Sequence, residues 1–353
     1  MTVLLILTAL EFLLRTCVIV PSFNLKSVSS ELGSCKIILD DKLLYKIKPL
    51  SRPDINNYGF RGHKVNIAKQ SRKRILFLGD SFIMGMSGGE ATSIPELLEK
   101  KLGAAYEVLN LGILGYGPDQ SLRQLEETGL KFRPDMVILG IFPANDFNDI
   151  YKNKIFELDK NGELKLRENN LVTDALPRIK CLYLWNWLVF KLKGKDIAGF
   201  KKLMNTLFNE PFDTDFMIDE KSGKSVMKIN LMRAVLRRFR EELSLKNIDF
   251  AAVIIPSYEN MQNNYLLKTL NIPREKYFIN EDTTENVCTA ETIPCVNLYK
   301  IFLKQKNNGP LYSDKDHHLN FSGRLKTAEI VFNKIQKDIE TAQDIAPPPE
   351  YAP

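Results

Sequence analysis

Three short groups of polar and glycine residues follow apolar, strand-length runs in this sequence. The first is Gly79-Asp80-Ser81, at the end of the apolar run 75–79. A serine on a sharp strand-to-helix turn exposes its hydroxyl at the top of a sheet, and the N-terminus of the next helix favours developing negative charge. Ser81 is therefore a candidate nucleophile, although an Asp-Ser pair also serves as an ordinary helix N-cap.

The second and third groups supply possible hydrogen-bond donors. Asn110-Leu-Gly-Ile-Leu-Gly115-Tyr-Gly follows the run 107–112, and Ala-Asn145-Asp follows the run 135–142. Closely spaced glycines let backbone N–H groups approach a ligand, though a plain loop uses them too. The Asn145 side chain can donate to an oxyanion, or it can simply form an Asx-turn.

A base and its orienting acid occur together near the C-terminus, in Asp314-Lys-Asp316-His317-His318-Leu-Asn320. The chain has only three histidines, and the third is His63. In an extended segment, Asp316 and His318 project to one side and His317 to the other, which favours His318 as a base oriented by Asp316. The alternative is a polar surface turn with Asn320 as a helix N-cap.

In this order the groups resemble the SGNH/GDSL hydrolase superfamily, over roughly residues 55–335. Asn56-Asn-Tyr-Gly-Phe-Arg-Gly62 is similar to a segment that precedes the nucleophile in membrane-anchored bacterial members. The resemblance implies a catalytic triad of Ser81, Asp316 and His318. It also implies an oxyanion hole made of the Ser81 and Gly115 backbone N–H groups and the Asn145 side chain, with no metal and no organic cofactor. One departure is that Pro143 replaces the glycine of the G-x-N-D block.

Two rival motifs have the wrong context. Gly85-Met-Ser87-Gly-Gly89 matches the G-x-S-x-G nucleophile elbow, but it lies six residues past the strand end, in a loop. The glycines at 112, 115 and 117 have the wrong spacing for a dinucleotide fingerprint.

Strand-like and helix-like runs alternate from residue 74 onward. The predicted strands are 75–79, 107–112, 135–142, 250–256 and 294–299, and the predicted helices are 94–102, 118–130, 226–247 and 322–339. This alternation predicts a parallel sheet of about five strands covered on both faces, which is a three-layer α/β/α sandwich. Ligands of such sheets bind at the carboxyl ends of the strands.

The rest of the chain divides into segments of different character. We expect a juxtamembrane segment at 24–70, a hydrolase-like domain at 71–340 and a disordered Pro-rich tail at 341–353. An insertion at 151–225 holds the basic, aromatic run 178–195. That run either lies on a membrane or over the active site, or packs on the body with its lysines solvated.

Residues 2–23 are apolar apart from Glu11 and Arg15, and are long enough to cross a bilayer once. We expect 1–23 to be a transmembrane anchor or uncleaved signal; a cleaved signal peptide and an amphipathic helix packed on the domain are the alternatives. The lysines that follow would place the body in the cytoplasm by the positive-inside rule. Long domains translocate largely regardless of charge, so the family resemblance favours an extracytoplasmic, periplasmic body.

The composition limits the class of protein and the kinds of partner and metal site that the chain can have. The chain has 353 residues, 44% of them hydrophobic and 26% charged, which is typical of a globular protein. The net charge of +6 is too small to indicate a nucleic-acid partner, and three histidines argue against a multi-histidine metal site. None of the five cysteines forms a CxxC pair; Cys288 and Cys295 either close a short disulfide loop or are free thiols.

We therefore expect a serine esterase or acyl hydrolase that cleaves O-acyl esters, often acetyl groups on carbohydrate, as the resemblance implies. An O-acyltransferase, in which a sugar hydroxyl replaces water, is the alternative with the same chemistry. A non-catalytic, membrane-tethered glycan-binding protein is the alternative from another class.

Overall fold

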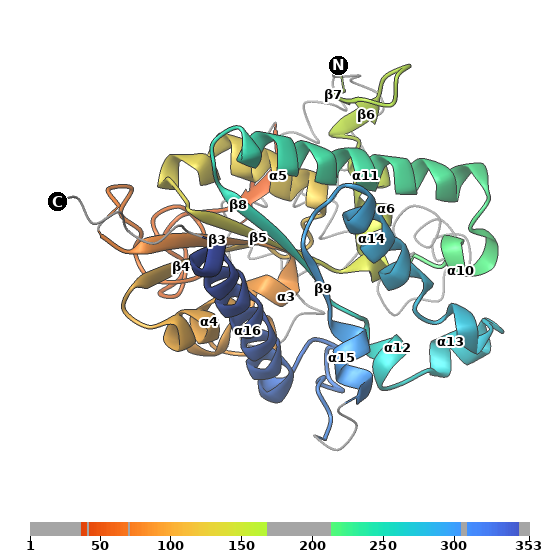
Figure 1. Ribbon diagram of the computed structural model, residues 1–353. Coiled ribbons are helices and arrows are strands. Elements are labelled where there is room, and N and C mark those ends of the chain that lie inside the picture. The colour runs from red at the N-terminus through yellow and green to blue at the C-terminus, as the bar shows by residue number, and fades with distance from the viewer. Residues whose placement is uncertain (1–36, 41, 70, 168–212, 305–308, 346–353) are drawn as a thin grey trace, which may run out of the picture.

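A five-stranded parallel sheet forms the centre of the molecule in the computed structural model (Figure 1). The structure describes residues 37–40, 42–69, 71–167, 213–304 and 309–345. The strand order is β4-β3-β5-β8-β9, and every neighbouring pair is parallel. The strand that precedes Ser81 is β3, so the Ser81 turn lies between the loops that follow β4 and β5.

The strands of this sheet are β3 (Lys73–Gly79), β4 (Tyr106–Gly112), β5 (Met136–Ile141), β8 (Asp249–Ile254) and β9 (Cys295–Asn297). Two antiparallel hairpins lie outside it, β1–β2 (Ile37–Asp40, Leu44–Ile47) and β6–β7 (Phe156–Leu158, Leu164–Leu166). The longer helices are α4 (Ile94–Leu102), α5 (Pro118–Glu127), α6 (Pro143–Asn153), α11 (Gly223–Ser244), α14 (Ile279–Ala290) and α16 (Phe321–Ile345). Shorter ones are α3 (Ser81–Met84), α10 (Asp215–Asp219), α12 (Tyr258–Met261), α13 (Tyr265–Thr269) and α15 (Leu298–Lys304).

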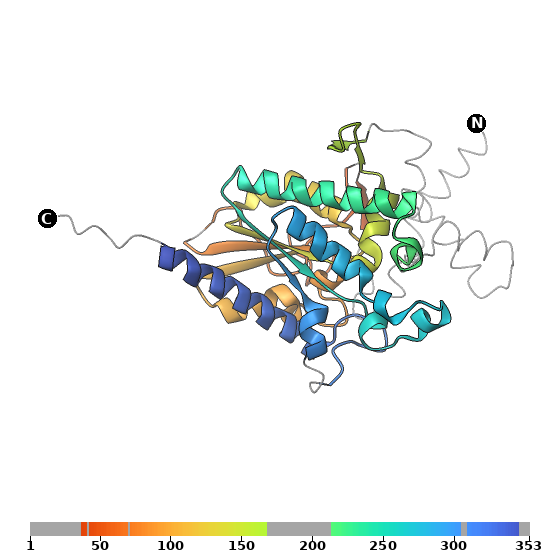
Figure 2. The ribbon, with the colours of Figure 1, turned by 45° about the vertical axis from the view of Figure 1, so that its right-hand side comes forward.

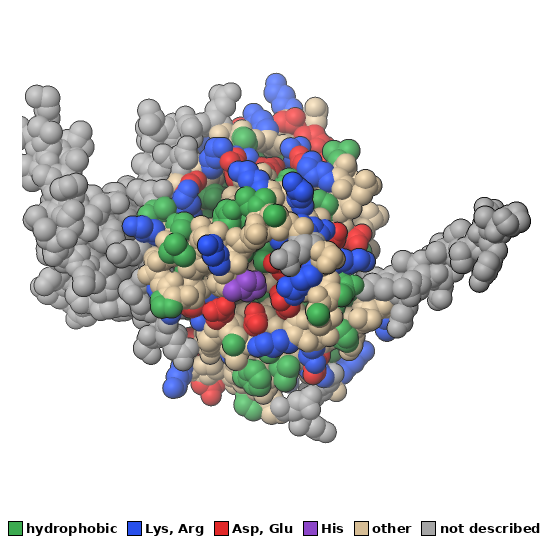
Figure 3. Space-filling model, turned by 90° about the vertical axis from the view of Figure 1, so that its left-hand side faces the viewer, with side chains coloured by type: hydrophobic (Ala, Val, Ile, Leu, Met, Phe, Trp, Pro, Cys, Tyr) green, Lys and Arg blue, Asp and Glu red, His purple; other side chains and the backbone are tan. Residues whose placement is uncertain are grey.

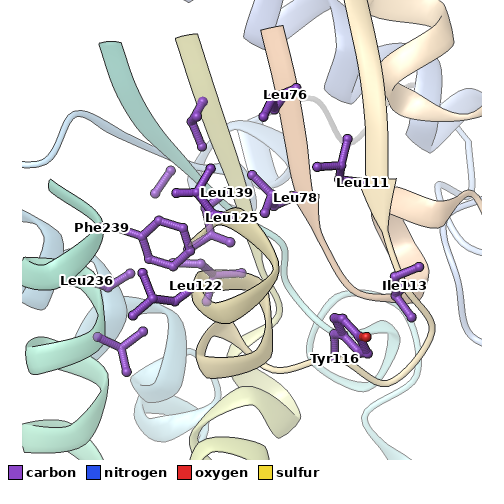
Figure 4. Packing of buried hydrophobic residues seen from close by; sticks show 14 of the residues in the cluster. Leu76, Leu78, Leu111, Ile113, Tyr116, Leu122, Leu125, Leu139, Leu236 and Phe239 are labelled. Carbon is purple, nitrogen blue, oxygen red and sulfur yellow. The ribbon is translucent and has the colours of Figure 1, made fainter. Parts of the chain in front are cut away.

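Helices cover both faces of the sheet, as Figures 1 and 2 show. Successive side chains of β3 point to opposite faces, because the side-chain period of a strand is two. Leu76 and Leu78 enter a core with α5, α6, α11 and α14, part of which is seen in Figure 4. Ile75 and Phe77 enter a second core with α4 and α16. The predicted three-layer α/β/α fold is confirmed.

Close packing behind the Ser81 turn depends on a residue without a side chain. A Cβ on Gly112, the last residue of β4, would lie 2.4 Å from the Met84 backbone nitrogen and 2.8 Å from the Ile83 carbonyl carbon. Only glycine therefore lets α3 lie directly against the end of β4.

The predicted elements match the observed ones closely. The α4 helix has the predicted bounds, and the predicted helix 118–130 is α5 followed by a 3₁₀ turn at Gly129–Phe132. At the C-terminus α16 continues to Ile345, so the helix enters the segment assigned to the tail.

The predicted juxtamembrane segment 24–70 is, within its described residues 37–40 and 42–69, part of the folded body. Leu43, Ile47 and Phe60 are buried in the same core as α5 and α11. The Tyr45 hydroxyl donates to the Leu114 carbonyl oxygen at 2.7 Å, and the Tyr116 hydroxyl donates to the Tyr45 carbonyl oxygen at 2.5 Å. The β1–β2 hairpin thus packs on the loop that carries Gly115.

Several sequence predictions concern residues outside the described ranges. These are the anchor or signal at 1–23, the basic runs 178–195 and 200–212 of the insertion, and the tail from 346. Within the described ranges, no helix combines the length and apolar character that a membrane span requires.

One face of the body carries charges of both signs. On the face in Figure 3, lysines and arginines are interspersed with aspartates and glutamates. This distribution agrees with the small net charge of +6.

Candidate active site

The Ser81 turn is built by the end of β3. Gly79 has φ +146°, a backbone conformation that side chains with a Cβ rarely adopt, and it turns the chain out of the strand. Asp80 is the N-cap of α3, and its carboxylate accepts from the Phe82 backbone N–H at 2.9 Å. Ser81 is the first residue of the helix, and only 8% of its surface is exposed to solvent.

His318 reaches this serine from the loop before α16. Its Nε2 atom lies 2.8 Å from Ser81 Oγ, although the two residues are 237 positions apart. The ring also packs against Phe82, with 4.8 Å between ring centroids. The nucleophile and base candidates identified from the sequence are thus in hydrogen-bond contact.

The segment around His318 is a turn, which corrects the expectation of an extended chain. The Ser313 N–H donates to the His318 carbonyl oxygen at 2.8 Å, and His317 has φ +62°, in the left-handed region. The two histidines still point to different partners. His317 Nδ1 lies 2.7 Å from Glu259 Oε1, and its ring stacks on Tyr258 with 4.1 Å between centroids.

The contact between Asp316 and His318 also differs from the expected one. His318 Nδ1 lies 2.9 Å from the backbone carbonyl oxygen of Asp316, and 3.9 Å from its carboxylate Oδ2. The main-chain carbonyl therefore fixes the tautomer with hydrogen on Nδ1, leaving Nε2 to accept a proton. The carboxylate contributes a nearby negative charge rather than the hydrogen bond.

The charge states of the two groups suit this arrangement. Burial lowers the pKa of His318, against the opposing effects of the Asp316 charge and carbonyl, so the imidazole is neutral at neutral pH. Burial by itself would raise the pKa of Asp316, but the Ser87 hydroxyl and the His318 charge outweigh it and lower the pKa below its usual value. At neutral pH Asp316 is therefore an anion beside a neutral base.

Two of the expected oxyanion donors follow the strands on either side of β3. Gly115 lies in the loop after β4, and Asn145 lies at the start of α6, directly after β5. Pro143, the departure from the G-x-N-D pattern, is the first residue of α6, where a missing N–H costs nothing. Asn145 is then in the first turn of that helix, and its buried Oδ1 has no hydrogen-bond partner among the described residues.

A buried polar cluster, which includes Asp213 from the insertion, contacts the start of α6 next to Asn145. The Asp213 N–H donates to the Ala144 carbonyl oxygen at 2.5 Å, and Asn280 Nδ2 donates to the Pro143 carbonyl oxygen at 3.3 Å. The Asp213 carboxylate pairs with Lys228 at 2.9 Å, and both side chains are fully buried. The chain returning from the insertion is thereby fixed beside the candidate oxyanion donor.

Two carboxyl groups are buried under the site. Burial raises the pKa of Asp80 to about 7. Burial and the charge of Asp80 raise the pKa of Asp146 well above its usual value, while its carboxylate accepts from the Phe142 N–H at 2.7 Å. The raised pKa values disfavour the charged forms of both groups, which limits the negative charge beneath the site.

Sequence reasoning assigned no supporting role to Ser87, whose hydroxyl donates to Asp316 Oδ2. The only available signal was the G-x-S-x-G match, which indicated a nucleophile instead. Cys288 and Cys295 are free thiols, and within the described residues no group of His, Cys, Asp and Glu could hold a metal ion.

Comparisons with known proteins give structural neighbours only. No protein-family model matches the chain. No curated protein sequence matches it. Solved structures that align with it include a lipase/acylhydrolase from Enterococcus faecalis, at 12% identity and TM-score 0.43, covering 75% of this chain and 96% of that one. An acetylxylan esterase from Geobacillus stearothermophilus aligns at 14% identity and TM-score 0.41, covering 76% and 95%.

A GDSL-like lipase from Bacteroides thetaiotaomicron aligns at 14% identity and TM-score 0.39, covering 79% of this chain and 93% of that one. Because these similarities are low, the assignment of activity rests on the contacts of this chain's own residues. In the order of its motifs, its parallel sheet and its Ser81–His318 pair, the chain is similar to SGNH/GDSL hydrolases.

Proposed function

We propose that this protein is a serine ester hydrolase of the SGNH/GDSL type, with Ser81 as nucleophile and His318 as general base. The observation that carries the proposal is the 2.8 Å contact between Ser81 Oγ and His318 Nε2. A weakly nucleophilic hydroxyl becomes reactive when a positioned base takes its proton. Three features favour this pair: a helix N-terminus at the serine, a neutral imidazole, and an oriented tautomer.

The reaction proceeds in two halves. Ser81 Oγ attacks the acyl carbonyl carbon while its proton passes to His318 Nε2, and the protonated imidazole then gives that proton to the departing alkoxide. In the second half, His318 takes a proton from water, the resulting hydroxide attacks the acyl-enzyme, and the proton returns to Ser81. Asp316 stabilises the imidazolium in both halves by its charge.

The oxyanion of each tetrahedral intermediate would be held by the Ser81 and Gly115 backbone N–H groups and the Asn145 side chain. The α3 and α6 helices begin at Ser81 and Pro143, so these donors include positions at helix N-termini. One such donor contributes roughly a 10²–10³-fold increase in kcat.

The substrate class that the resemblance favours is an O-acyl ester, often acetyl, on cell-envelope carbohydrate. Transfer of the acyl group to a glycan hydroxyl uses the same acyl-enzyme, and acyl transfer assays separate the two reactions.

We also propose that the apolar segment 1–23 anchors the protein and that the body is extracytoplasmic. Glu11 and Arg15, four residues apart, can pair on one face of a helix in that segment. Protease added to intact spheroplasts should therefore digest the body. Full protection of the body until the membrane is opened would contradict this orientation.

Replacing Ser81 by alanine should abolish ester hydrolysis and leave the fold intact, because the substitution removes only the attacking oxygen. Turnover of p-nitrophenyl acetate and labelling by a fluorophosphonate probe measure the loss, and circular dichroism checks the fold. A Ser87→Ala protein should still be labelled, since Ser87 is not the nucleophile. Retained turnover in a folded Ser81→Ala protein would exclude this mechanism, and absence of labelling in the wild type would favour a non-catalytic binding protein.

Replacing His318 by alanine should lower kcat by roughly 10⁴-fold or more, because no other base contacts Ser81 Oγ among the described residues. The matched control is His317→Ala, which should have little effect on kcat, since His317 is held by Glu259 and Tyr258. Asp316→Asn should fall between the two, because it removes the charge and leaves the backbone carbonyl on Nδ1. The opposite order of the two histidine variants would refute the assignment of the base.

The pH profile should report the lowered pKa of His318. A base is active only when unprotonated, so a pKa below the usual 6.5 keeps activity until the pH falls below that value. We expect the acidic limb of kcat/KM to have its midpoint below pH 6.5. Asp316→Asn should move this acidic limb to still lower pH, because it removes a charge that stabilises the imidazolium. An acidic limb above 6.5 would contradict the burial argument.

A further inference from the structure

The loop after α3 contacts the acid of the candidate triad. Residues 85–89 follow the Ser81 helix, and the Ser87 hydroxyl donates to Asp316 Oδ2 across 229 residues of sequence. This is the same carboxylate oxygen that lies 3.9 Å from His318 Nδ1. The other carboxylate oxygen lies 3.4 Å from the His318 backbone N–H, and the Ser313 side chain also hydrogen-bonds to this carboxyl group. The Ser87 hydroxyl is therefore well placed to set the position of Oδ2 relative to the imidazole.

Ser87 itself is held in an uncommon backbone conformation. Its φ is +67°, in the left-handed region, so the loop around it must be fixed by other contacts. Two buried arginines supply them, one from each side.

The first is Arg61, from the Asn56-Asn-Tyr-Gly-Phe-Arg-Gly62 segment, and it is 3% exposed. Its Nη1 donates to the Gly85 carbonyl oxygen at 2.7 Å, and its Nη2 donates to the Gly88 carbonyl oxygen at 2.8 Å. Its Nε donates to Asp54 Oδ2 at 3.1 Å, which balances the buried charge. The planar guanidinium thus spans Ser87, holding the carbonyl groups on both sides of it.

The second is Arg324, in the first turn of α16 and also 3% exposed. Its Nη1 donates to the Met86 carbonyl oxygen at 3.2 Å and to the Leu319 carbonyl oxygen at 2.7 Å. Its Nε donates to the Thr92 carbonyl oxygen at 2.8 Å. One side chain therefore ties the Ser87 loop to the residue that follows His318.

We infer that Ser87 is a positioning residue, which holds the Asp316 carboxylate beside His318, and that Arg61 and Arg324 fix the loop that presents it. The inference rests on the proposed function and assigns this role to residues outside the triad and oxyanion hole. It also gives a role to the G-x-S-x-G match and to the arginine before the nucleophile. The lowering of the Asp316 pKa by the Ser87 hydroxyl is consistent with it.

The test is a double-mutant cycle between Ser87 and Asp316, measured with p-nitrophenyl acetate. Ser87→Gly removes the hydroxyl without straining the left-handed backbone, and we expect kcat to fall about tenfold with KM unchanged. In the Asp316→Asn background the same substitution should have little further effect, because its action passes through the carboxylate. A merely structural role for Ser87 would lower kcat in both backgrounds equally.

Two more variants keep the test independent of folding. Asn247→Gly is a matched control, because Asn247 is also left-handed, at φ +54°, and follows α11 away from the site. Its kcat should equal that of the wild type. Ser87→Asn keeps a donor at a residue type that tolerates this backbone, and it should recover part of the lost kcat.

The outcomes separate this inference from the proposed function. A wild type that hydrolyses the ester while Ser87→Gly has unchanged kcat overturns the positioning role alone. Equal losses in both backgrounds, or a change confined to KM, also overturn it. A wild type that neither hydrolyses the ester nor reacts with fluorophosphonate overturns the proposed function together with this inference.

Discussion

The hydrogen bond between Ser81 Oγ and His318 Nε2 is the interaction on which the candidate site depends. It joins two loops that are 237 residues apart, at a distance of 2.8 Å. The serine is placed by the end of a central strand buried on both faces, and the histidine by a turn before the last helix. The α16 helix packs on α4, and its Arg324 donates to the carbonyl groups of Met86, after the Ser81 helix, and of Leu319, after His318. These contacts fix the serine segment and the histidine segment relative to one another.

Around that bond, the protein buries polar and charged groups that would weaken an ordinary core. Lys228 and Asp213 are completely buried and paired, and removing one partner of such a pair typically costs about 3–5 kcal/mol. Asp80 and Asp146 are also buried, with raised pKa values. Asp80 and Asp146 directly follow β3 and β5, and groups with strongly perturbed pKa values cluster at functional sites.

Much of the fold could be predicted because the central strands are largely buried. The run 75–79 is continuously apolar, 107–112 is mostly apolar, and the helices between the strands have amphipathic spacing. The candidate nucleophile could be located because its motif directly follows a strand, and the candidate base because the order of the motifs resembles the SGNH/GDSL superfamily. The extended form around His318 was wrong, since periodicity does not reveal that His317 is left-handed. The Ser87–Asp316 contact could not be predicted from the sequence, because it joins two loops that are 229 residues apart and no local pattern connects them.

The separation of the two site loops along the chain has a consequence for biosynthesis. Ser81 emerges from the ribosome 237 residues before His318, which at ordinary elongation rates is a delay of roughly ten to fifty seconds. During that interval the serine has no base, since both His318 and the helix that anchors its loop are still unmade. By the proposed mechanism, a nascent chain at this stage lacks the base that activates Ser81. Any product that ends before His318 would carry the nucleophile motif without its base.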